Sequence, residues 1–401
     1  GLEMALVVGG DLWFMDTELR EPVQATATDG AESNPLFSRD GKTLWFTRAQ
    51  DGQSDVWKLE PKDPSRYWWQ QTEFLETRMT STRERPSNLE LTPDGKKLFF
   101  QSGRGNLHIL DVATGETTEF LKGFSSLSYS ISPDSNWLAY AQQDNDFNSE
   151  IWLAPLDAHI PPVNVSRHPR NDSNPVFSPD GKILAFTGQR GMKETDVHYV
   201  YLREDSADET SRSRTLEKAL ETMKKKRTEP KPAVAPRKEN ESVDASKSTE
   251  TPTVVRVDLE RIHERVQQIS LPNTTESNLI FSPDSKRLAF SATVEGKSGW
   301  YSVEFPDKLT PKLMSSTTFT DARWTKDAGG ILGLAQGVPA KLENGEKQVT
   351  YSFSVRQERN RAGRLREGFN AAWMAMSEIW YDPALGNKNW DAVRRKYETA
   401  A

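Results

Sequence analysis

The sequence predicts an all-β fold, a β-propeller of four-stranded blades, and three observations carry this prediction. A short phrase, an alternating strand followed by Ser/Thr-Pro-Asp-Gly or a close variant, returns six times and is degenerate in its last copy, Ala322 to Asp327. Setting two insertions aside, the copies lie about 40–46 residues apart, the length of one propeller blade. The 12 Trp, 17 Phe and 9 Tyr also favour strands, because aromatic side chains fit pleated, half-buried surfaces.

Each part of the phrase has a structural role. In the copy Ser178-Pro179-Asp180-Gly181, Pro presets φ, Asp hydrogen-bonds nearby backbone and Gly accepts a positive φ. A second strand follows, as in Leu184-Ala185-Phe186, and a third strand carries an aliphatic–aromatic pair such as Val56-Trp57. A propeller distributes its turns around a ring, so we expect the recurring aspartates to form turns and not a shared calcium or carboxylate site. These are Asp40, Asp94, Asp134, Asp180 and Asp284.

The number of blades depends on the first segment, residues 4–26. Strands are expected near Ala5–Val8, Leu12–Asp16 and Val23–Thr26, like the last three strands of a blade whose first strand is missing. Together with the phrase-bearing blades, this partial blade predicts a seven-bladed ring over residues 1–355. A six-bladed ring is the alternative.

Two insertions interrupt the repeat. The first, Pro64 to Thr82, is expected to be a loop after a third strand; its Trp68 and Trp69 are expected to cap the adjacent blade, with a binding lip as the alternative. The second, residues 204–252, opens with a charged, helix-like stretch from Leu216 to Lys226 and continues in a Pro, Lys, Glu and Ser-rich tract. That tract cannot bury enough apolar surface to offset its chain entropy, so residues 228–252 are predicted to be disordered.

Composition excludes several classes of function. A net charge of −6 argues against a nucleic-acid binder, which would neutralise phosphates with excess Lys and Arg. The absence of Cys excludes disulfides and thiolate chemistry, and no apolar run approaches the roughly 20 residues of a membrane span. No leader is expected at the N-terminus, where Gly1 stands without an initiator Met and suggests a trimmed start. The compartment, cytoplasmic or exported, stays open.

The sequence lacks several common catalytic motifs. The sequence contains no Gly-x-Ser-x-Gly elbow, no His-Glu-x-x-His and no phosphate-binding loop. The histidines lack ligand spacing and are expected to be structural or on the surface. We therefore predict no catalytic residue, no metal site and no cofactor in this chain, and substrate-binding residues are not identified. The histidines are His108, His159, His168, His198 and His263.

After Val355 the apolar periodicity changes from two to 3.6. Phe369, Trp373, Met376 and Trp380 fall at i, i+4, i+7 and i+11, which predicts a single stripe on a helix. Asp382-Pro383 ends this helix and Asn389 can cap a second helix that begins near Trp390. Two short helices do not form a domain alone, so residues 356–401 are predicted to be a linker and the start of a helical subdomain. The candidates for contacting the remainder of that subdomain, its core, are Phe369, Trp373, Met376, Trp380 and Trp390.

The tail also contains a cluster of arginines. They are interleaved with Glu358 and Glu367, and we expect them to decorate a solvated linker, with a grip on an acidic partner or a peptide carboxylate as the alternative. These are Arg356, Arg359, Arg361, Arg364 and Arg366.

Two resemblances suggest a function. The repeat, from about Ser33 to Thr325, resembles TolB-like propeller repeats. The tail resembles the start of the catalytic core of tricorn-like serine peptidases, and residues 257–266 resemble a further element of those chains. The tail pattern consists of Ala372-Trp373, Trp380-Tyr381-Asp382-Pro383, Asn389-Trp390 and Tyr397.

The tricorn-like resemblance implies a non-catalytic propeller that guides or gates peptides and docks a catalytic core. The implied partners are peptides or proteins and that core, which we expect to follow Ala401 in the natural protein; a homo-oligomer stays open. The full-length protein is then expected to be a serine peptidase, whereas this chain alone should hydrolyse no peptide. The alternative is a TolB-like protein-interaction propeller with no peptidase link. A prolyl-oligopeptidase-type hydrolase is disfavoured because Trp-rich helices, not an α/β-hydrolase pattern, follow the propeller.

Overall fold

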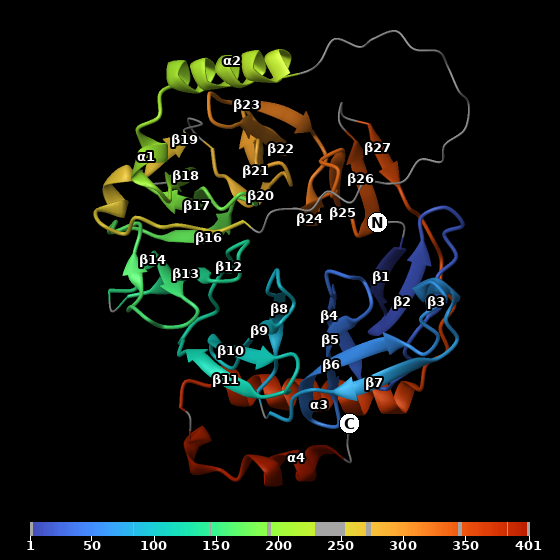
Figure 1. Ribbon diagram of the computed structural model, residues 1–401. Coiled ribbons are helices and arrows are strands. Elements are labelled where there is room, and N and C mark those ends of the chain that lie inside the picture. Colours follow the sequence, from blue (N-terminus) through green and yellow to red (C-terminus); the bar gives the residue numbers. More distant parts are fainter. Residues whose placement is uncertain are drawn as a thin grey trace, which may run out of the picture.

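The computed structural model describes residues 3–82, 84–144, 146–190, 194–228, 253–269, 274–343, 347–382 and 384–398. Its strands form six four-stranded sheets and one three-stranded sheet, arranged as blades around a ring (Figure 1). All neighbouring strands within a blade are antiparallel and consecutive in sequence. The ring is therefore a seven-bladed propeller, which confirms the predicted fold and rules out the six-bladed alternative.

The blades follow one another in chain order. The first contains β1 (Glu3–Val8), β2 (Asp11–Asp16) and β3 (Val23–Gln24), and the second β4 (Ala31–Phe37), β5 (Leu44–Gln50), β6 (Gln53–Pro61) and β7 (Phe74–Arg78). The third contains β8 (Ser87–Leu91), β9 (Lys97–Ser102), β10 (Asn106–Asp111) and β11 (Thr117–Leu121), and the fourth β12 (Tyr129–Ile131), β13 (Trp137–Gln143), β14 (Ser149–Pro155) and β15 (Val163–Asn164). The fifth contains β16 (Asp172–Phe177), β17 (Ile183–Gln189), β18 (Thr195–Tyr201) and β19 (Gln267–Ile269). The sixth contains β20 (Ser277–Phe281), β21 (Arg287–Val294), β22 (Lys297–Glu304) and β23 (Lys308–Ser315), and the seventh β24 (Phe319–Trp324), β25 (Gly330–Ala335), β26 (Val338–Glu343) and β27 (Gln348–Thr350).

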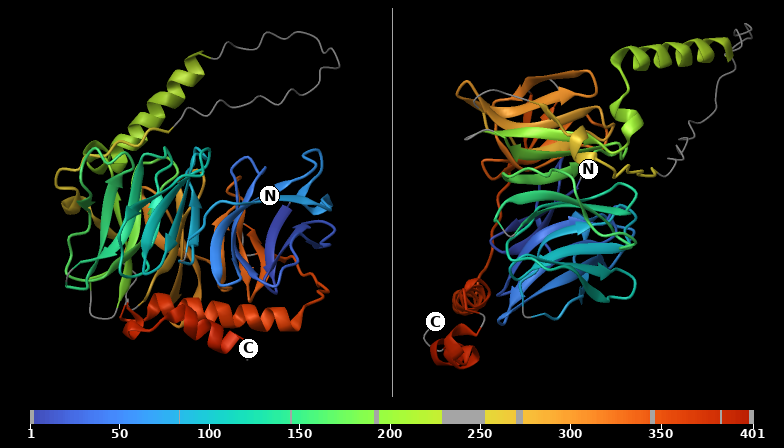
Figure 2. Two further views of the ribbon diagram at one scale, coloured as in Figure 1. Left: turned by 90° about the horizontal axis from the view of Figure 1, so that it is seen from below. Right: turned by 90° about the vertical axis from the view of Figure 1, so that its left-hand side faces the viewer.

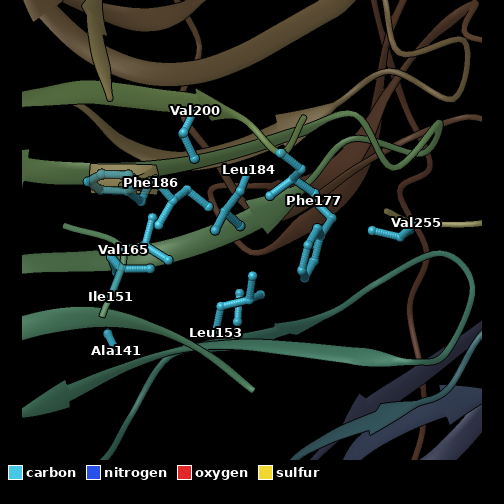
Figure 3. Packing of buried hydrophobic residues seen from close by; sticks show 12 residues of the cluster. Ala141, Ile151, Leu153, Val165, Phe177, Leu184, Phe186, Val200 and Val255 are labelled. Atoms are coloured by element: carbon cyan, nitrogen blue, oxygen red, sulfur yellow. The ribbon is translucent and has the colours of Figure 1, made fainter. Parts of the chain in front are cut away.

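The second strand of each blade is almost continuously apolar because both of its faces are buried. In β17, Leu184 and Phe186 pack towards the fourth blade, whereas Ile183 and Ala185 pack towards the sixth. Figure 3 shows the cluster between the fourth and fifth blades, with Leu184 and Phe186 at its centre. Six such clusters join consecutive blades from the first to the seventh. The blade-to-blade core thus follows directly from the repeated pattern.

The asparagine at the start of the repeated phrase has a backbone role. Asn34, Asn88, Asn174 and Asn278 lie on innermost strands with φ of 52°, 50°, 53° and 54°. The register with the second strand shifts around each of them. Asn is among the few residues other than Gly that tolerate this left-handed region, so the phrase encodes a bulge as well as a turn.

The predicted turn chemistry is present after each bulge. Ser178 Oγ donates to Asp180 Oδ1 at 2.6 Å, Lys182 N donates to the same oxygen at 3.2 Å, and Gly181 has φ of 68°. The end of the ring that carries these turns is called the turn face below. The opposite end, which carries turns such as Asp51-Gly52, is called the helix face.

The first insertion differs from the prediction of a loop through Thr82. A short 3₁₀ helix, η1 (Trp68–Gln70), is followed by β7, which pairs with β6 as the fourth strand of the second blade. The loop prediction was wrong for this part, because Phe74 buries its ring against Phe14 (centroids 5.4 Å apart) and extends the sheet. Trp68 is buried and packs on Phe14 of the first blade, with ring centroids 4.7 Å apart. This contact agrees with the expected capping of the adjacent blade.

The second insertion begins with α1 (Glu204–Ala207) and α2 (Ser211–Thr228), and α2 covers the expected helix-like stretch. Figure 2 shows α2 projecting away from the ring. Residues 229–252 of the tract predicted to be disordered lie outside the described residues. The chain returns through η2 (Ile262–Arg265), where Ile262 is buried in the cluster of the fourth and fifth blades.

The tail consists of α3 (Arg361–Ile379), η3 (Leu385–Asn387) and α4 (Trp390–Glu398). Figure 2 shows α3 and α4 along one end of the strands, and Figure 1 places α3 beneath the blades of β5 to β10. The contacts described below identify that end as the helix face. Among the described residues, every helix is too short or too polar to span a bilayer.

Candidate functional site

Helix α3 is attached to the helix face through polar side chains. Arg364 Nη2 lies 3.2 Å from Asp11 Oδ2, and its Nη1 donates to Gly30 O at 2.9 Å. The Asp51 backbone N–H donates to Glu367 Oε2 at 2.7 Å. Arg85 donates to Glu378 Oε2 at 2.7 Å, which ties the end of α3 to the third blade. The helix is therefore held on the ring by charge-assisted hydrogen bonds.

The predicted apolar stripe lies on a different side of α3. Gly363, Glu367, Asn370 and Met374 are the buried residues of the helix, whereas Phe369 and Trp373 are half-buried. Met376 and Trp380 are 41% and 40% exposed. The sequence correctly placed Phe369, Trp373 and Met376 on one helix, but Trp380 is extended and lies just past the end of α3. The sequence also could not show that the propeller would contact a neighbouring side of the helix.

Helix α4 covers part of the stripe. The rings of Trp373 and Trp390 stack with centroids 6.3 Å apart, and each indole N–H donates to the other residue's backbone carbonyl, at 3.0 and 3.1 Å. Beyond this contact, Ile379 and Tyr381 are 69% and 80% exposed. The tail surface, defined as Phe369, Trp373, Met376, Ile379, Trp380, Tyr381 and Trp390, is thus rich in large apolar groups that the ring does not cover.

The expectation that the tail arginines decorate a solvated linker is wrong for one of them. Arg364 packs on the ring and neutralises Asp11, which is only 2% exposed. Glu367, which was expected beside them on the linker, is one of the buried residues of α3. The physical reason is that both face the helix side of the ring, whereas Arg361 and Arg366 point to solvent.

A set of buried carboxylates on the helix face was not predicted from the sequence. Asp55 Oδ1 accepts from Thr80 Oγ1 at 3.0 Å, and Thr80 Oγ1 accepts from the Val56 N–H at 2.9 Å. Glu150 and Ser166 repeat this arrangement in the fourth blade. The signal was an acid directly before the aliphatic pair of the third strand, as in Asp55-Val56-Trp57. These carboxylates fasten the fourth strand and have a structural role.

Two of the histidines stack on phenylalanine rings inside blades. His108 and His198 lie in third strands and stack on Phe100 and Phe186, with centroids 5.2 and 5.6 Å apart. Burial lowers the pKa of His198 to about 4, so it is neutral at pH 7. Across the described ranges, no group of three or more His, Asp or Glu side chains is placed to hold a metal ion.

The innermost strands carry exposed polar side chains. Asn34, Asn174 and Asn278 are exposed, and their side-chain amides donate back to Thr47, Thr187 and Ser291 at 3.1, 3.2 and 3.0 Å. Glu90, on β8, accepts from the Ile131 N–H at 3.2 Å, and burial raises its pKa to about 7. The phrase predicted these positions as strand residues but not these hydrogen bonds.

A cavity of about 800 Å³ opens on the turn face at the first two blades. Glu3 and Asp16 stand opposite each other in the register of β1 and β2, and both line the cavity. Asp16 is 7% exposed; its Oδ1 accepts from the Glu18 and Leu19 N–H groups at 2.8 and 2.6 Å. Asp16 Oδ2 and Glu3 Oε1 are buried and have no hydrogen-bond partner within the described residues.

The lining of this cavity also includes a group of apolar and aromatic side chains. Tyr67 and Leu19 are 64% and 59% exposed, and Trp69 is half-buried beside them. Trp68 and Phe37 lie behind, with their rings in an edge-on contact at 5.3 Å. The first insertion therefore does two things: Trp68 caps the first blade, and Tyr67 and Trp69 line a hollow. The chain brings these groups together from positions far apart in the sequence.

Comparison with known proteins shows the fold. No protein-family model matches the sequence, and no curated protein matches it. Among solved structures, the tricorn protease matches 100% of this chain with a TM-score of 0.71 at 12% identity, and this chain spans 38% of that protein's length. The oligogalacturonate lyase of Vibrio parahaemolyticus matches 92% of this chain and 91% of its own, with a TM-score of 0.56 at 12% identity. TolB from Acinetobacter baumannii has a TM-score of 0.42 over 75% of this chain, at 12% identity.

At these identities the matches establish a seven-bladed propeller that is similar to those of several proteins. The similar proteins include a protease and a lyase, so the fold by itself specifies neither activity. The function must be argued from the sites described above.

Proposed function

We propose that this chain is the non-catalytic propeller part of a tricorn-like serine peptidase, in which it guides or gates peptides and docks the catalytic core. The observation that carries the proposal is the tail surface. Helix α3 is fixed to the ring by its polar side, whereas Trp373, Met376 and Trp380 remain partly exposed. Burying one large apolar side chain stabilises a complex by about 1.5–3 kcal/mol, so this surface is suited to association.

Two further features support the proposal. The tricorn match extends over the whole chain, tail included, whereas the lyase match covers 92% of it. The innermost strands carry exposed polar side chains, such as Asn34, Asn174 and Asn278, which suit contact with a peptide backbone. The proposal requires that the natural protein continue past Ala401 into a Ser-bearing core, and the coding sequence downstream of Ala401 tests this directly.

The double variant Trp373→Ser/Trp380→Ser tests the role of the tail surface. We expect the thermal midpoint of the propeller to stay nearly unchanged, because neither ring contributes to the inter-blade clusters. In the full-length protein the same variant should lose association of the core, measured by limited proteolysis, and peptidase activity on fluorogenic peptides. The isolated chain should hydrolyse no peptide in either form.

The matched control is Leu365→Ser, which also removes an exposed apolar side chain of α3 (54% exposed) but lies outside the tail surface. It should leave core association intact. If the double variant instead unfolds the propeller, the tail is an integral cap of the ring. The TolB-like interaction propeller, with no peptidase link, would then be the better account.

A further inference from the structure

We propose that the turn-face cavity binds the cationic side chain of a peptide, a Lys or Arg that stands beside an apolar residue. The inference rests on the proposed function, because it names the class of peptide that the propeller would select. The site consists of the carboxylates of Glu3 and Asp16, of Leu19 beside Asp16, and of an aromatic wall formed by Tyr67 and Trp69.

The carboxylates of this cavity lack the donor that their burial requires. Like charges placed directly opposite each other on neighbouring strands are destabilising, and Glu3 and Asp16 occupy such a pair. A buried charge is normally paired, because an unpaired one costs desolvation energy. Yet Asp16 Oδ2 and Glu3 Oε1 have no hydrogen-bond partner in the part of the chain that the structure describes. An ammonium or guanidinium group that enters beside these carboxylates supplies the positive charge and the donor that the described chain does not.

The aromatic wall suits the remainder of such a ligand. Aromatic faces attract cations and also cover apolar side chains. The wall is held in place: Trp68 Nε1 donates to Gly41 O at 2.8 Å, and Gln71 Nε2 donates to Asp63 O at 2.7 Å. Tyr67 and Trp69 are therefore presented on a fixed support, which lowers the entropy lost on binding.

Other ligand classes fit less well. A divalent metal takes six or more oxygen ligands or several nitrogen and sulfur ligands, and among the described residues no group of three or more His, Asp or Glu side chains is placed to hold one. Lys326 and Arg39 also line the cavity, but Arg39 donates to Pro93 O at 3.2 Å on the neighbouring blade, and an anion would meet the carboxylates of Glu3 and Asp16. The volume of about 800 Å³ lies within the range of ligand pockets and holds two or so side chains.

Calorimetric titration of the whole chain with two blocked tripeptides tests the proposal. The probes are acetyl-Phe-Lys-Phe-amide and the same peptide with norleucine in place of Lys, which differ only in charge and length of one side chain. We expect the lysine peptide to bind about tenfold more tightly, because a hydrogen bond to a charged group contributes more than an apolar contact of that size.

Asp16→Asn is the decisive variant. The amide keeps Oδ1 as the acceptor for the Glu18 and Leu19 N–H groups, so the turn is retained while the charge is removed. We expect this variant to bind both peptides equally. Trp69→Ala should weaken both peptides to a similar degree. The control is Asp111→Asn, which also accepts from backbone amides in a turn, at 3.0 and 2.8 Å, and does not line the cavity.

The outcomes separate this inference from the proposed function. A lysine preference that persists in Asp16→Asn would overturn the site. Equal binding of the two peptides by the unaltered chain would also overturn it, while leaving a general peptide-guiding role intact. Failure of Trp373→Ser/Trp380→Ser to affect core association would instead count against the proposed function, since neither residue touches this cavity.

Discussion

Strand β2 begins and ends with a buried aspartate, and the two carboxylates meet different surroundings. Asp11, at the helix face, is 2% exposed and is bound by Arg364 from the tail, 3.2 Å away. Asp16, at the turn face, is 7% exposed and leaves Oδ2 without a partner among the described residues. One strand thus carries a structural acid at one end and a candidate binding group at the other.

The difference shows what distinguishes a buried carboxylate with a structural role from one that could bind a ligand. Near Asp11 the chain supplies its own cations, since Glu32 is likewise bound by Arg48 at 2.7 Å and Asp55 by Arg78 at 2.5 Å. Near Asp16 the nearest charged strand neighbour is another acid, Glu3. Burial alone therefore identifies neither role, and the donor set around each carboxylate decides it.

Removing a cation from the helix face should have the largest effect. Arg48 is buried, pairs with the fully buried Glu32, and lies over the ring of Trp57 at 4.6 Å. Breaking a buried pair by removing one partner costs about 3–5 kcal/mol, so Arg48→Met should lower the free energy of unfolding by that amount. Urea denaturation followed by circular dichroism measures it.

The pH dependence of that variant follows from Glu32. Burial raises the pKa of Glu32, and the charge of Arg48 opposes this. Without Arg48 the folded-state pKa rises further above the unfolded value, so stability is retained at low pH and lost as the pH rises through the folded pKa. The deficit should be larger at pH 8 than at pH 5. Arg39→Met, on the turn face, is the control; a deficit equal to that of Arg48→Met would contradict the comparison.

Arg364→Met should have an intermediate effect. It leaves Asp11 buried without its ion pair, although Gln24 Nε2 and the Thr28 N–H still donate to the carboxylate at 3.3 Å. Losing one partner of a buried acceptor costs about 1–3 kcal/mol. We expect a corresponding fall in the free energy of unfolding and faster proteolysis within α3. The control is Arg366→Met, which removes an exposed arginine of the same helix. It should change neither the free energy of unfolding nor the rate of proteolysis. A similar loss of stability in this control would mean that helical propensity, and not the ion pair, causes the effect of Arg364→Met.

The fold was predictable from the sequence because the same local sequence pattern recurs in most blades. Each copy of the phrase encodes a strand, a turn and a second strand locally, so the blades could be placed without knowing any distant contact. The prediction was wrong at β7, because the insertion before Phe74 separates this fourth strand from the rest of its blade in the sequence. It also could not choose between the two sides of α3, since the 3.6-residue period groups Trp373 with Trp380 but does not say what faces the ring.

The candidate site was less predictable for a physical reason. Asp11 and Arg364 are 353 residues apart, and the cavity combines β1, β2, the first insertion and Lys326 of the seventh blade. No local pattern encodes such contacts. One part could have been found: an acid at each end of β2, opposite a further acid on β1, is visible once two adjacent strands are assigned and their register is set by the Gly9-Gly10 turn.

The smallest expected effect has the opposite sign and tests the comparison most directly. Glu3→Gln removes one of the two opposed carboxylates while keeping the shape of the side chain. Relief of a like-charge cross-strand pair is worth about 0.2–1 kcal/mol, so the variant should be slightly more stable than the unaltered chain, whereas Arg48→Met and Arg364→Met are less stable. The gain should shrink at high salt, because screening already weakens the repulsion. Glu116→Gln, an exposed acid of the third blade, should leave stability unchanged. Differential scanning calorimetry at two salt concentrations measures these shifts. If Glu3→Gln destabilises the propeller, then Glu3 has a structural partner of the kind that Arg364 provides for Asp11, and the two ends of β2 are alike after all.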